Sequence, residues 1–389
     1  MRTRKINMPF ELAFIIISIA VIAITYKTYV GYGLYPWYIK TIFLLLLIIS
    51  ICAPFICFFV KRTSAADSLV YLTKPLYFMF GFVFFLFIIT FLRDIAWTII
   101  DVVRRTPLEE MKNPPRLLQV NIITFIACLV LCFYGFYEAE KKANIVTYEI
   151  TTAKVNKPTK VVLLADLHID TDVSTKYVTD LVNRVNALKP DAVLIAGDIV
   201  DNRPAKLYKQ MIELKKLQPK GHIFVVLGNH EFYSGALEWA ITFGRMGFQF
   251  LNNYGMKLDD TGLYIAGIPD INSTQNTNMQ VNVEQALSQA NENDYKIILS
   301  HTPKIVAGMN KDNTDLVLSG HTHGGQIYPF HYFAKQANEG RLAGFYDVEG
   351  IKMYITRGTR YWGPPMRILA PSEITVFNFV PEKNKANDK

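Results

Sequence analysis

Four long apolar runs near the N-terminus constrain the fold of this chain more than any other feature of its sequence. Residues 41–60, 75–92 and 117–137 contain no charged side chain. A further run, over about 9–30, holds fifteen uncharged positions before Lys27, whose long side chain can reach a membrane interface. Because a bilayer offers the backbone no hydrogen-bond partner, each run is expected to form a membrane-spanning helix.

Two other interpretations of these runs explain less of the sequence. A cleaved signal peptide accounts for the first run but not for the other three. Buried helices of a soluble bundle would leave 1–137 with very little polar surface to face water. Aromatic side chains flank the second run, as in the interfacial belts of membrane proteins: Tyr35, Trp37 and Tyr38. We therefore expect an all-α bundle of about four transmembrane helices over 1–137, with the lipid bilayer as its partner.

The charges around the predicted spans indicate an anchor and leave its orientation open. The uncharged stretches of the spans contain no residue that would mark a pathway for ions or protons. With a cytoplasmic N-terminus, eight Lys and Arg flank the spans inside and seven outside, which does not decide the orientation. The basic leading tail favours cytoplasmic termini. We expect a multi-pass protein of the cell (inner) membrane, with its C-terminal part on the same side as the N-terminus.

The segment after the third span, 93–105 (RDIAWTIIDVVRR), has two interpretations. Its charged side chains fall near one helical face, while Trp97, Ile100 and Val103 fall on another. This pattern fits a helix that lies at the membrane interface. A packed extension of the third span fits the pattern equally well.

Composition separates the chain into two chemically different parts. Residues 1–137 carry 13 Lys and Arg against 6 Asp and Glu, whereas 138–389 carry 28 against 27. The net charge of +8 therefore lies almost entirely in the apolar third, and the remainder lacks the basic excess of a nucleic-acid-binding domain. All four cysteines lie in the apolar third, so the remainder has neither disulfides nor a cysteine metal site.

From residue 138 the sequence is that of a folded polar domain. Residues 138–147 are expected to be a polar linker, 148–382 the domain, and 383–389 a frayed tail. Helical periodicity appears over 175–188 and 206–217. The expected strands lie at 161–165, 192–196, 223–227, 264–268, 296–299, 316–318, 353–356 and 374–379. Alternating strands and helices predict α/β layers in which helices cover a sheet.

Polar clusters follow directly after five of the expected strands. Their sequences are A-D-L-H, G-D-I-V-D, G-N-H-E, S-H-T-P and G-H-T-H-G-G-Q. Because loops at the carboxyl ends of strands converge on one edge of a sheet, we expect these clusters to form one composite site. A lone histidine or a lone G-D-x-x-D is more often structural, so the assignment depends on all five clusters occurring together.

The clusters supply the donors of a transition-metal site. Imidazole, carboxylate and amide ligands together suit manganese, iron or zinc, whereas magnesium or calcium would use fewer imidazoles. Seven potential ligands, one of them shared, fit two divalent ions about 3.5–4 Å apart. The seven are Asp166, His168, Asp198, Asn229, His301, His321 and His323.

The ordered motifs resemble those of the calcineurin-like metallophosphoesterase superfamily, over about 148–380. The likeness is greatest to a membrane-anchored bacterial branch that also contains hydrolases of a lipid A precursor, UDP-diacylglucosamine. The resemblance implies a four-layer α-β-β-α sandwich, here preceded by the helical bundle. The N-terminal third resembles the family only in having hydrophobic spans.

The resemblance also implies a role for each motif residue. His230 matches the family's proton donor to the leaving oxygen, and Asp201 matches the acid that orients His230. The two metal ions would each take four ligands and share Asp198. One ion would be held by Asp166, His168, Asp198 and His323, and the other by Asp198, Asn229, His301 and His321.

A C-terminal pattern resembles the family's closing segment and departs from it at two places. The usual glycine pair near Gly358 is broken by Thr359 and Arg360, and Ser372 interrupts a Pro-Glu pair. These departures affect substrate contacts rather than the metal site. Two alternatives stay open for this segment. Its arginines either bind phosphate or form structural ion pairs, and its aromatic residues either line an acyl or nucleobase pocket or belong to the core: Arg357, Arg360, Arg367, Tyr361 and Trp362.

The resemblance implies a membrane-anchored phosphodiesterase or pyrophosphatase that uses a metal-bridging hydroxide. A phosphate-containing substrate is expected, and a lipid-linked one such as a lipid A precursor fits the membrane anchor. Two alternatives are a phosphodiesterase or phosphatase for a soluble nucleotide or phosphoprotein, and a membrane sensor with a degenerate hydrolase domain. The complete ligand set argues against degeneracy. The sequence assigns no oligomeric state.

Overall fold

The computed structural model describes residues 10–31, 35–63, 69–105, 114–272 and 279–382. The chain separates into two units, one of residues 1–137 with 363–365 and one of residues 138–362 with 366–389. The expected tail, 383–389, lies outside the described residues.

The first unit is helical throughout its described part. Among the described residues, three helices are long and apolar enough to cross a membrane, and they contain the predicted spans 41–60, 75–92 and 117–137. The first predicted span corresponds to a shorter apolar helix that continues as one π-helical turn. The helices are α1 (Phe10–Tyr26), η1 (Lys27–Gly31), α2 (Trp37–Arg62), η2 (Val70–Leu72), α4 (Thr73–Arg104) and α5 (Pro114–Glu140).

Most apolar side chains of these helices face outward. Val21 of α1, Leu47 of α2 and Val83 of α4 form a small packed centre. Only 22–28% of the residues in the three long apolar windows are buried. A helix that is apolar on all sides needs lipid around it, so this surface is that of a membrane domain.

A polar cluster connects three helices of this unit. Arg93 of α4 donates hydrogen bonds to Asn121 Oδ1 (2.8 Å) and Thr124 Oγ1 (3.2 Å) of α5. Asn121 in turn donates to the backbone oxygen of Thr28 in η1 (2.9 Å). Helix α4 runs unbroken to Arg104, so 93–105 is an extension of the third span rather than a separate interfacial helix. The spanning helix therefore carries charged residues beyond its uncharged stretch, and Arg93 is accommodated because α5 supplies polar partners.

We expect Asn121→Leu to destabilise the helical unit. The substitution removes one buried and one partly buried hydrogen bond and leaves the Arg93 guanidinium without its amide partner, at a cost of about 1–3 kcal/mol. Thermal unfolding of the detergent-solubilised protein should show a lower midpoint. Ile123→Leu, at an exposed neighbouring position, is the control, and equal midpoints for the two variants would contradict this role.

The second unit contains two stacked sheets of six strands each within its described part. Their orders are β1-β12-β2-β3-β4-β5 and β10-β11-β9-β8-β7-β6. Strands β2 to β5 are parallel, as are β7, β8, β9 and β11. The strands are β1 (Asn144–Thr152), β2 (Thr159–Leu164), β3 (Ala192–Ala196), β4 (Ile223–Val226), β5 (Gln249–Phe250), β6 (Tyr254–Lys257), β7 (Leu263–Gly267), β8 (Tyr295–Leu299), β9 (Leu316–Ser319), β10 (Gly344–Val348), β11 (Ile351–Ile355) and β12 (Glu373–Pro381).

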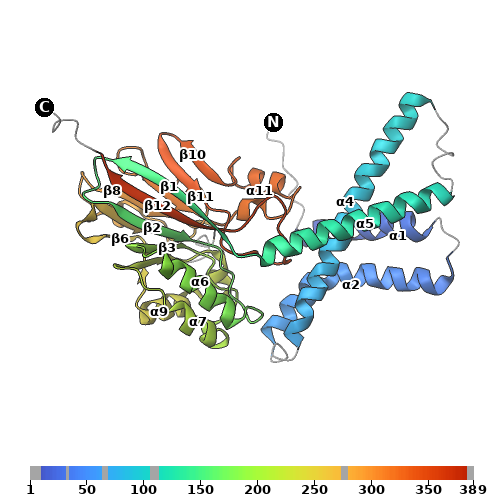
Figure 1. The fold of residues 1–389 in the computed structure, drawn as a ribbon, viewed down its shortest axis with the longest axis horizontal. Coiled ribbons are helices and arrows are strands. Elements are labelled where there is room, and N and C mark those ends of the chain that lie inside the picture. Colours follow the sequence, from blue (N-terminus) through green and yellow to red (C-terminus); the bar gives the residue numbers. More distant parts are fainter. Residues whose placement is uncertain (1–9, 32–34, 64–68, 106–113, 273–278, 383–389) are drawn as a thin grey trace, which may run out of the picture. The chain divides into compact units, whose positions relative to one another are not determined.

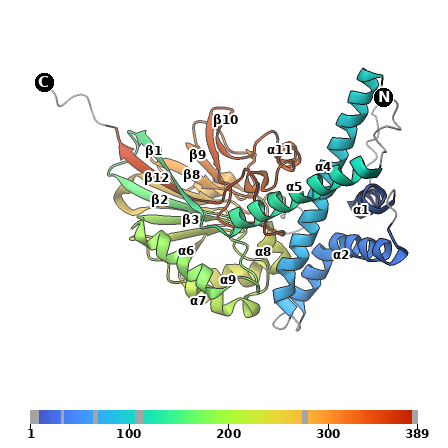
Figure 2. The ribbon, with the colours of Figure 1, turned by 45° about the vertical axis from the view of Figure 1, so that its right-hand side comes forward.

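Helices cover the outer faces of the two sheets, which confirms the predicted α-β-β-α layers. Helices α6, α7 and α9 pack on the first sheet (Figures 1 and 2), and α10 packs on the second. The helices are α6 (Thr175–Ala187), α7 (Tyr208–Leu214), α8 (Asn229–Ser234), α9 (Ala236–Met246), α10 (Val283–Leu287) and α11 (His331–Ala337), with short 3-10 turns η4 (Pro204–Lys206), η5 (Asp259–Thr261) and η7 (His323–Gly325).

The alternation of side chains along β2 shows why its sequence is continuously apolar. Val162 and Leu164 face α6 and α7, whereas Val161 and Leu163 face the second sheet. Both faces of a central parallel strand are buried, so both sets of side chains are apolar. All eight expected strands are present.

The edge of the first sheet departs from expectation. Most of residues 138–147 lie in regular secondary structure and do not form a linker, because α5 continues to Glu140 and β1 begins at Asn144. Strand β1 pairs in parallel with β12 at the sheet edge, and its side chains are half-buried at most. An edge strand buries little apolar surface, which is why β1 has no strong apolar signature.

Candidate metal centre

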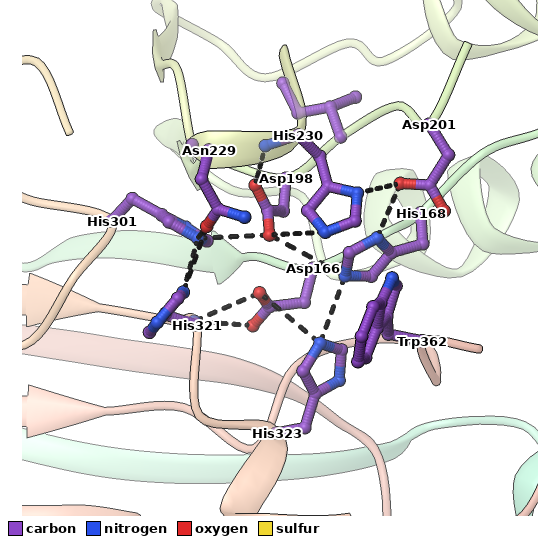
Figure 3. A network of polar contacts seen from close by, with 12 residues as sticks. Asp166, His168, Asp198, Asp201, Asn229, His230, His301, His321, His323 and Trp362 are labelled. Atoms are coloured by element: carbon purple, nitrogen blue, oxygen red, sulfur yellow. Dashed lines mark hydrogen bonds and ion pairs between the residues drawn. The ribbon is translucent and has the colours of Figure 1, made fainter. Parts of the chain in front are cut away.

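The nine side chains singled out in the sequence converge at the carboxyl ends of five strands (Figure 3). The first sheet contributes the loops after β2, β3 and β4, and the second sheet contributes the loops after β8 and β9. In chain order these loops carry Asp166 with His168, Asp198 with Asp201, Asn229 with His230, His301, and His321 with His323.

Among the described residues, three sets of side chains are compact enough to hold a metal ion. One set, His168 with Asp198 and His230, shares a residue with each of the other two, which form two separate groups. In one group, the ligand atoms of Asp166, His168 and His323 all lie within 4.8 Å of one another, as do those of Asp198, His301 and His321 in the other. Within the first group, His168 Nε2 lies 3.0 Å from His323 Nε2. In the second, Asn229 Oδ1 lies 3.2 Å from His301 Nε2 and 3.1 Å from His321 Nδ1.

Asp198 lies between the two groups. Its Oδ2 is 3.1 Å from His301 Nε2 and 3.8 Å from His168 Nε2. Its other oxygen, Oδ1, accepts a hydrogen bond from the backbone N–H of His230 (2.9 Å). One carboxylate oxygen therefore faces ligands of both groups, which is the arrangement of a bridging carboxylate.

Hydrogen bonds at the far side of the rings fix which imidazole nitrogen faces the site. His301 Nδ1 donates to Ala196 O (2.8 Å), His323 Nδ1 donates to Arg360 O (3.1 Å), and His168 Nδ1 donates to Asp201 Oδ1 (2.8 Å). When the ring is neutral, each Nε2 then presents a lone pair, as a metal ligand requires. Two such lone pairs 3.0 Å apart repel unless a cation lies between them. The donor set therefore fits divalent metal ions.

Backbone strain is concentrated at the same residues. Non-glycine residues seldom adopt positive φ, which costs on the order of 1 kcal/mol or more for each. The strained candidate ligands are Asp166 (55°), His168 (42°), Asp198 (50°), His321 (71°) and His323 (50°). Backbone hydrogen bonds between the loops, Asp166 N to Gly197 O (3.0 Å) and His168 N to Asp198 O (3.1 Å), hold these conformations.

The glycine before Asn229 is required by close packing. A Cβ atom added at Gly228 would collide with the Asp198 carboxylate and its backbone nitrogen. Only glycine lets the loops after β3 and β4 approach closely enough to bring Asn229 beside the ligands of the second group.

Glu231 is a functional position that the sequence analysis did not assign. Its carboxylate is fully buried and accepts the backbone N–H groups of Gly228 (2.7 Å), Asp198 (3.0 Å) and Val200 (2.9 Å). It thereby fixes the loop that carries Asp198. The available signal was the acidic residue three positions after Gly228, which caps the first turn of α8.

His230 and Asp201 form a second polar unit beside the ligand groups. His230 Nδ1 lies 2.7 Å from Asp201 Oδ1, the same oxygen that accepts from His168. Burial alone would lower the pKa of His230, but Asp201 and Asp198 outweigh burial and raise that pKa to about 9. Burial opposes the charge of Asp201, yet the two imidazoles hold its pKa well below the ordinary value. In this structure His230 is therefore protonated at neutral pH and able to donate a proton.

Burial shifts the pKa values of two other site residues in opposite directions. It raises the pKa of Asp166 to about 6 and lowers that of His321 to about 4. Burial also opposes the charge of Asp198, but His301, His230 and His168 outweigh it and keep its pKa below the ordinary range. Charge separation of this kind within one cluster of side chains is typical of functional centres.

The structure resolves the alternatives for the closing segment. Arg367 is fully buried and donates to the backbone oxygens of His323, Ala370 and Arg360, while Arg357 pairs with Glu373 (2.9 Å). These arginines are structural in this arrangement.

The two aromatic residues of the segment differ from each other. Tyr361 is buried, as a core residue would be, but Trp362 is 53% exposed. The Trp362 ring lies 5.8 Å from the His230 ring, at the rim of the site (Figure 3).

Comparison with known proteins gives consistent results. A sequence model described as calcineurin-like phosphoesterase matches residues 159–325. An uncharacterized metallophosphoesterase of Helicobacter pylori is 35% identical over 265 residues, which cover 67% of this chain and 70% of that protein. A transmembrane protein with metallophosphoesterase domain from Danio rerio is 32% identical over 269 residues, covering 66% of this chain and 61% of that protein.

Solved structures align at lower similarity. A dimetal phosphatase from Danio rerio aligns with a TM-score of 0.38 and 13% identity, over 57% of this chain and 99% of that one.

We expect Asp198→Ala to reduce metal binding more than any other single substitution in the site, because both groups lose the oxygen that faces them. The metal content of the purified protein after dialysis measures this effect, with Asp312→Ala on the exposed surface as the control. Retention of the wild-type metal content in Asp198→Ala would refute the bridging role.

In metal-free protein, we expect the His230 imidazole to stay protonated up to a pH of about 9 and to lose its proton as the pH rises through that value. In Asp201→Asn the main charged partner is gone while Asp198 remains, and the His230 pKa should fall clearly below the wild-type value. Histidine-labelled NMR titration follows both proteins. The same pKa in wild type and variant would contradict the assignment.

Proposed function

Because the chain belongs to the calcineurin-like phosphoesterase family and is a metal-dependent phosphoester hydrolase, we propose that it cleaves a phosphodiester or pyrophosphate bond with two divalent ions. The observation that carries this proposal is the position of the Asp198 carboxylate, whose Oδ2 faces both ligand groups. A shared carboxylate supports a two-ion site rather than two independent sites.

The proposed metal ligands follow the two groups of side chains described above, with Asp198 shared between them. Divalent ions bound there would supply Lewis acidity, which lowers the pKa of water and offsets negative charge on the phosphate oxygens. The number of imidazoles favours manganese, iron or zinc over magnesium. Asp166, His168, Asp198 and His323 are proposed to hold one ion, and Asp198, Asn229, His301 and His321 the other.

His230 is the proposed proton donor to the leaving oxygen. Its Nδ1 is held by Asp201, so Nε2, which lies 4.0 Å from Asp198 Oδ2 beside the ligand groups, is the nitrogen that can face a substrate. Asp201 keeps the imidazole protonated and correctly oriented. Since the same Asp201 oxygen also accepts from His168, the donor and one candidate ligand are aligned by a single carboxylate.

We propose a lipid-linked substrate, such as a UDP-diacylglucosamine-like lipid A precursor. Three apolar helices and the transmembrane relative indicate a membrane protein. Only residues 141–143 separate α5 from β1, so a short tether joins the hydrolase to a spanning helix. A tether of this length favours substrates confined near the bilayer. We further propose that the hydrolase faces the cytoplasm at the inner membrane, which protease protection in spheroplasts tests.

The activity is tested with full-length protein in detergent, using bis-p-nitrophenyl phosphate and added manganese. We expect turnover that requires metal, and His230→Asn should lower kcat by about 10²–10⁴-fold while leaving metal content unchanged. Tyr264→Phe, a buried tyrosine bonded to Ala286 O away from the site, is the matched control. No turnover with manganese, iron or zinc would refute the proposal and favour a degenerate sensor domain.

The substrate class is tested separately. Rates are compared for a UDP-diacylglucosamine-type lipid in mixed micelles and for soluble nucleotide diesters and phosphopeptides. A higher kcat/KM for the lipid supports the proposal. Preference for a soluble substrate would contradict the lipid assignment and leave the phosphoesterase assignment intact.

A further inference from the structure

Arg360, one of the residues that depart from the family-like pattern, touches every member of the first ligand group. Its side chain is buried and its Nη1 donates to the backbone oxygen of His168 (3.0 Å). Its backbone oxygen accepts from His323 Nδ1 (3.1 Å), and its backbone nitrogen donates to Asp166 O (3.1 Å). These contacts determine the backbone at His168 and the ring orientation of His323.

The guanidinium of Arg360 is itself held in place by its neighbour. Its Nη2 donates to the Tyr361 hydroxyl (2.8 Å), and its central carbon lies 4.1 Å from the Tyr361 ring centroid. The centroid of the Tyr177 ring lies 5.7 Å from the same guanidinium carbon. A buried cation between two aromatic rings is favourable only where its N–H groups are also satisfied. Tyr361 therefore determines where the guanidinium lies.

Tyr361 is bonded in turn to the end of a long helix. Its hydroxyl lies 3.2 Å from Glu140 Oε1 and, since it accepts from Arg360, it donates to that carboxylate. Glu140 is the last residue of α5, the helix that contains the predicted span 117–137. Glu140, Tyr361 and Arg360 all belong to the second unit. A continuous series of hydrogen bonds thus runs from the last turn of α5 to His168.

We infer that Arg360 is a positioning residue for the first ligand group. Glu140, at the end of α5, supports this positioning through its hydrogen bond with Tyr361. This inference rests on the proposed function. His168 and His323 are held at positive φ, a conformation that relaxes when its supports are removed. The second group is supported separately, since His301 Nδ1 donates to Ala196 O.

The inference predicts an asymmetric loss of metal. Removing the Tyr361 hydroxyl frees the guanidinium, weakens its bond to His168 O, and should lower affinity for one ion ten- to hundredfold. Affinity for the other ion should stay within about twofold of wild type, because the described contacts of Arg360 and Tyr361 with candidate ligands all belong to the first group. Loss of Glu140 charge should act in the same direction with a smaller effect.

The test uses full-length detergent-solubilised protein and measures manganese binding by equilibrium dialysis, independently of turnover. Tyr361→Phe and Glu140→Gln each remove one polar function without changing side-chain size much. Tyr264→Phe is the matched control, because it removes a buried hydroxyl of the same unit whose partner, Ala286 O, lies on α10 away from the ligands. Thermal unfolding of each variant reports any general loss of stability.

The result expected is two ions bound in wild type and in Tyr264→Phe, with one of the two selectively weakened in Tyr361→Phe and Glu140→Gln. Unchanged binding of both ions in Tyr361→Phe would overturn the inference. Equal weakening of both ions, in step with a lower unfolding midpoint, would overturn it as well by showing a merely structural role. Wild-type protein that binds no divalent ion would refute the proposed function itself.

Discussion

The requirement to gather buried imidazoles and carboxylates at one point governs the architecture of the second unit. Uncompensated charge or lone pairs in a buried site are costly, so the carboxylates and imidazoles must lie close enough to compensate one another or to share a cation. Asp198 can face His168 and His301 together only if the two sheets stack with their strand ends aligned, because His168 follows β2 of one sheet and His301 follows β8 of the other. The stacking of the two sheets, which buries apolar side chains between them, therefore brings the ligands together.

Each of the two units contains an arginine whose charge requires hydrogen-bond partners, but the surroundings of the two arginines differ. In the helical unit, Arg93 is stabilised by Asn121 and Thr124 because lipid offers no alternative partner. In the polar unit, the buried Arg360 is stabilised by Tyr361 and the carbonyl oxygen of His168. Helix α5 takes part in both units. Most of its residues belong to the helical unit, and its last residue, Glu140, is hydrogen-bonded to Tyr361 of the polar unit.

Particular residues show how far sequence reasoning reached. Strands β2 and β3 were predictable because both faces are buried, which makes their sequences continuously apolar. Strand β1 was missed because an edge strand alternates between exposed and half-buried positions. Glu231 was assigned no role, and Arg360 was left between phosphate binding and a structural ion pair. Both act on backbone groups of distant loops, and such contacts have no periodicity or spacing in the sequence.

The sequence by itself determined that apolar spans precede an α/β hydrolase domain and which side chains could ligate metal, because residue chemistry and strand-end position are local properties. Only the tertiary structure decided that Asp198 lies between two ligand groups, that Trp362 is exposed while Tyr361 is buried, and that Glu140 reaches Arg360 through Tyr361. Those facts depend on which loops meet in space, and loop contacts between separate strands are set by packing of the whole domain.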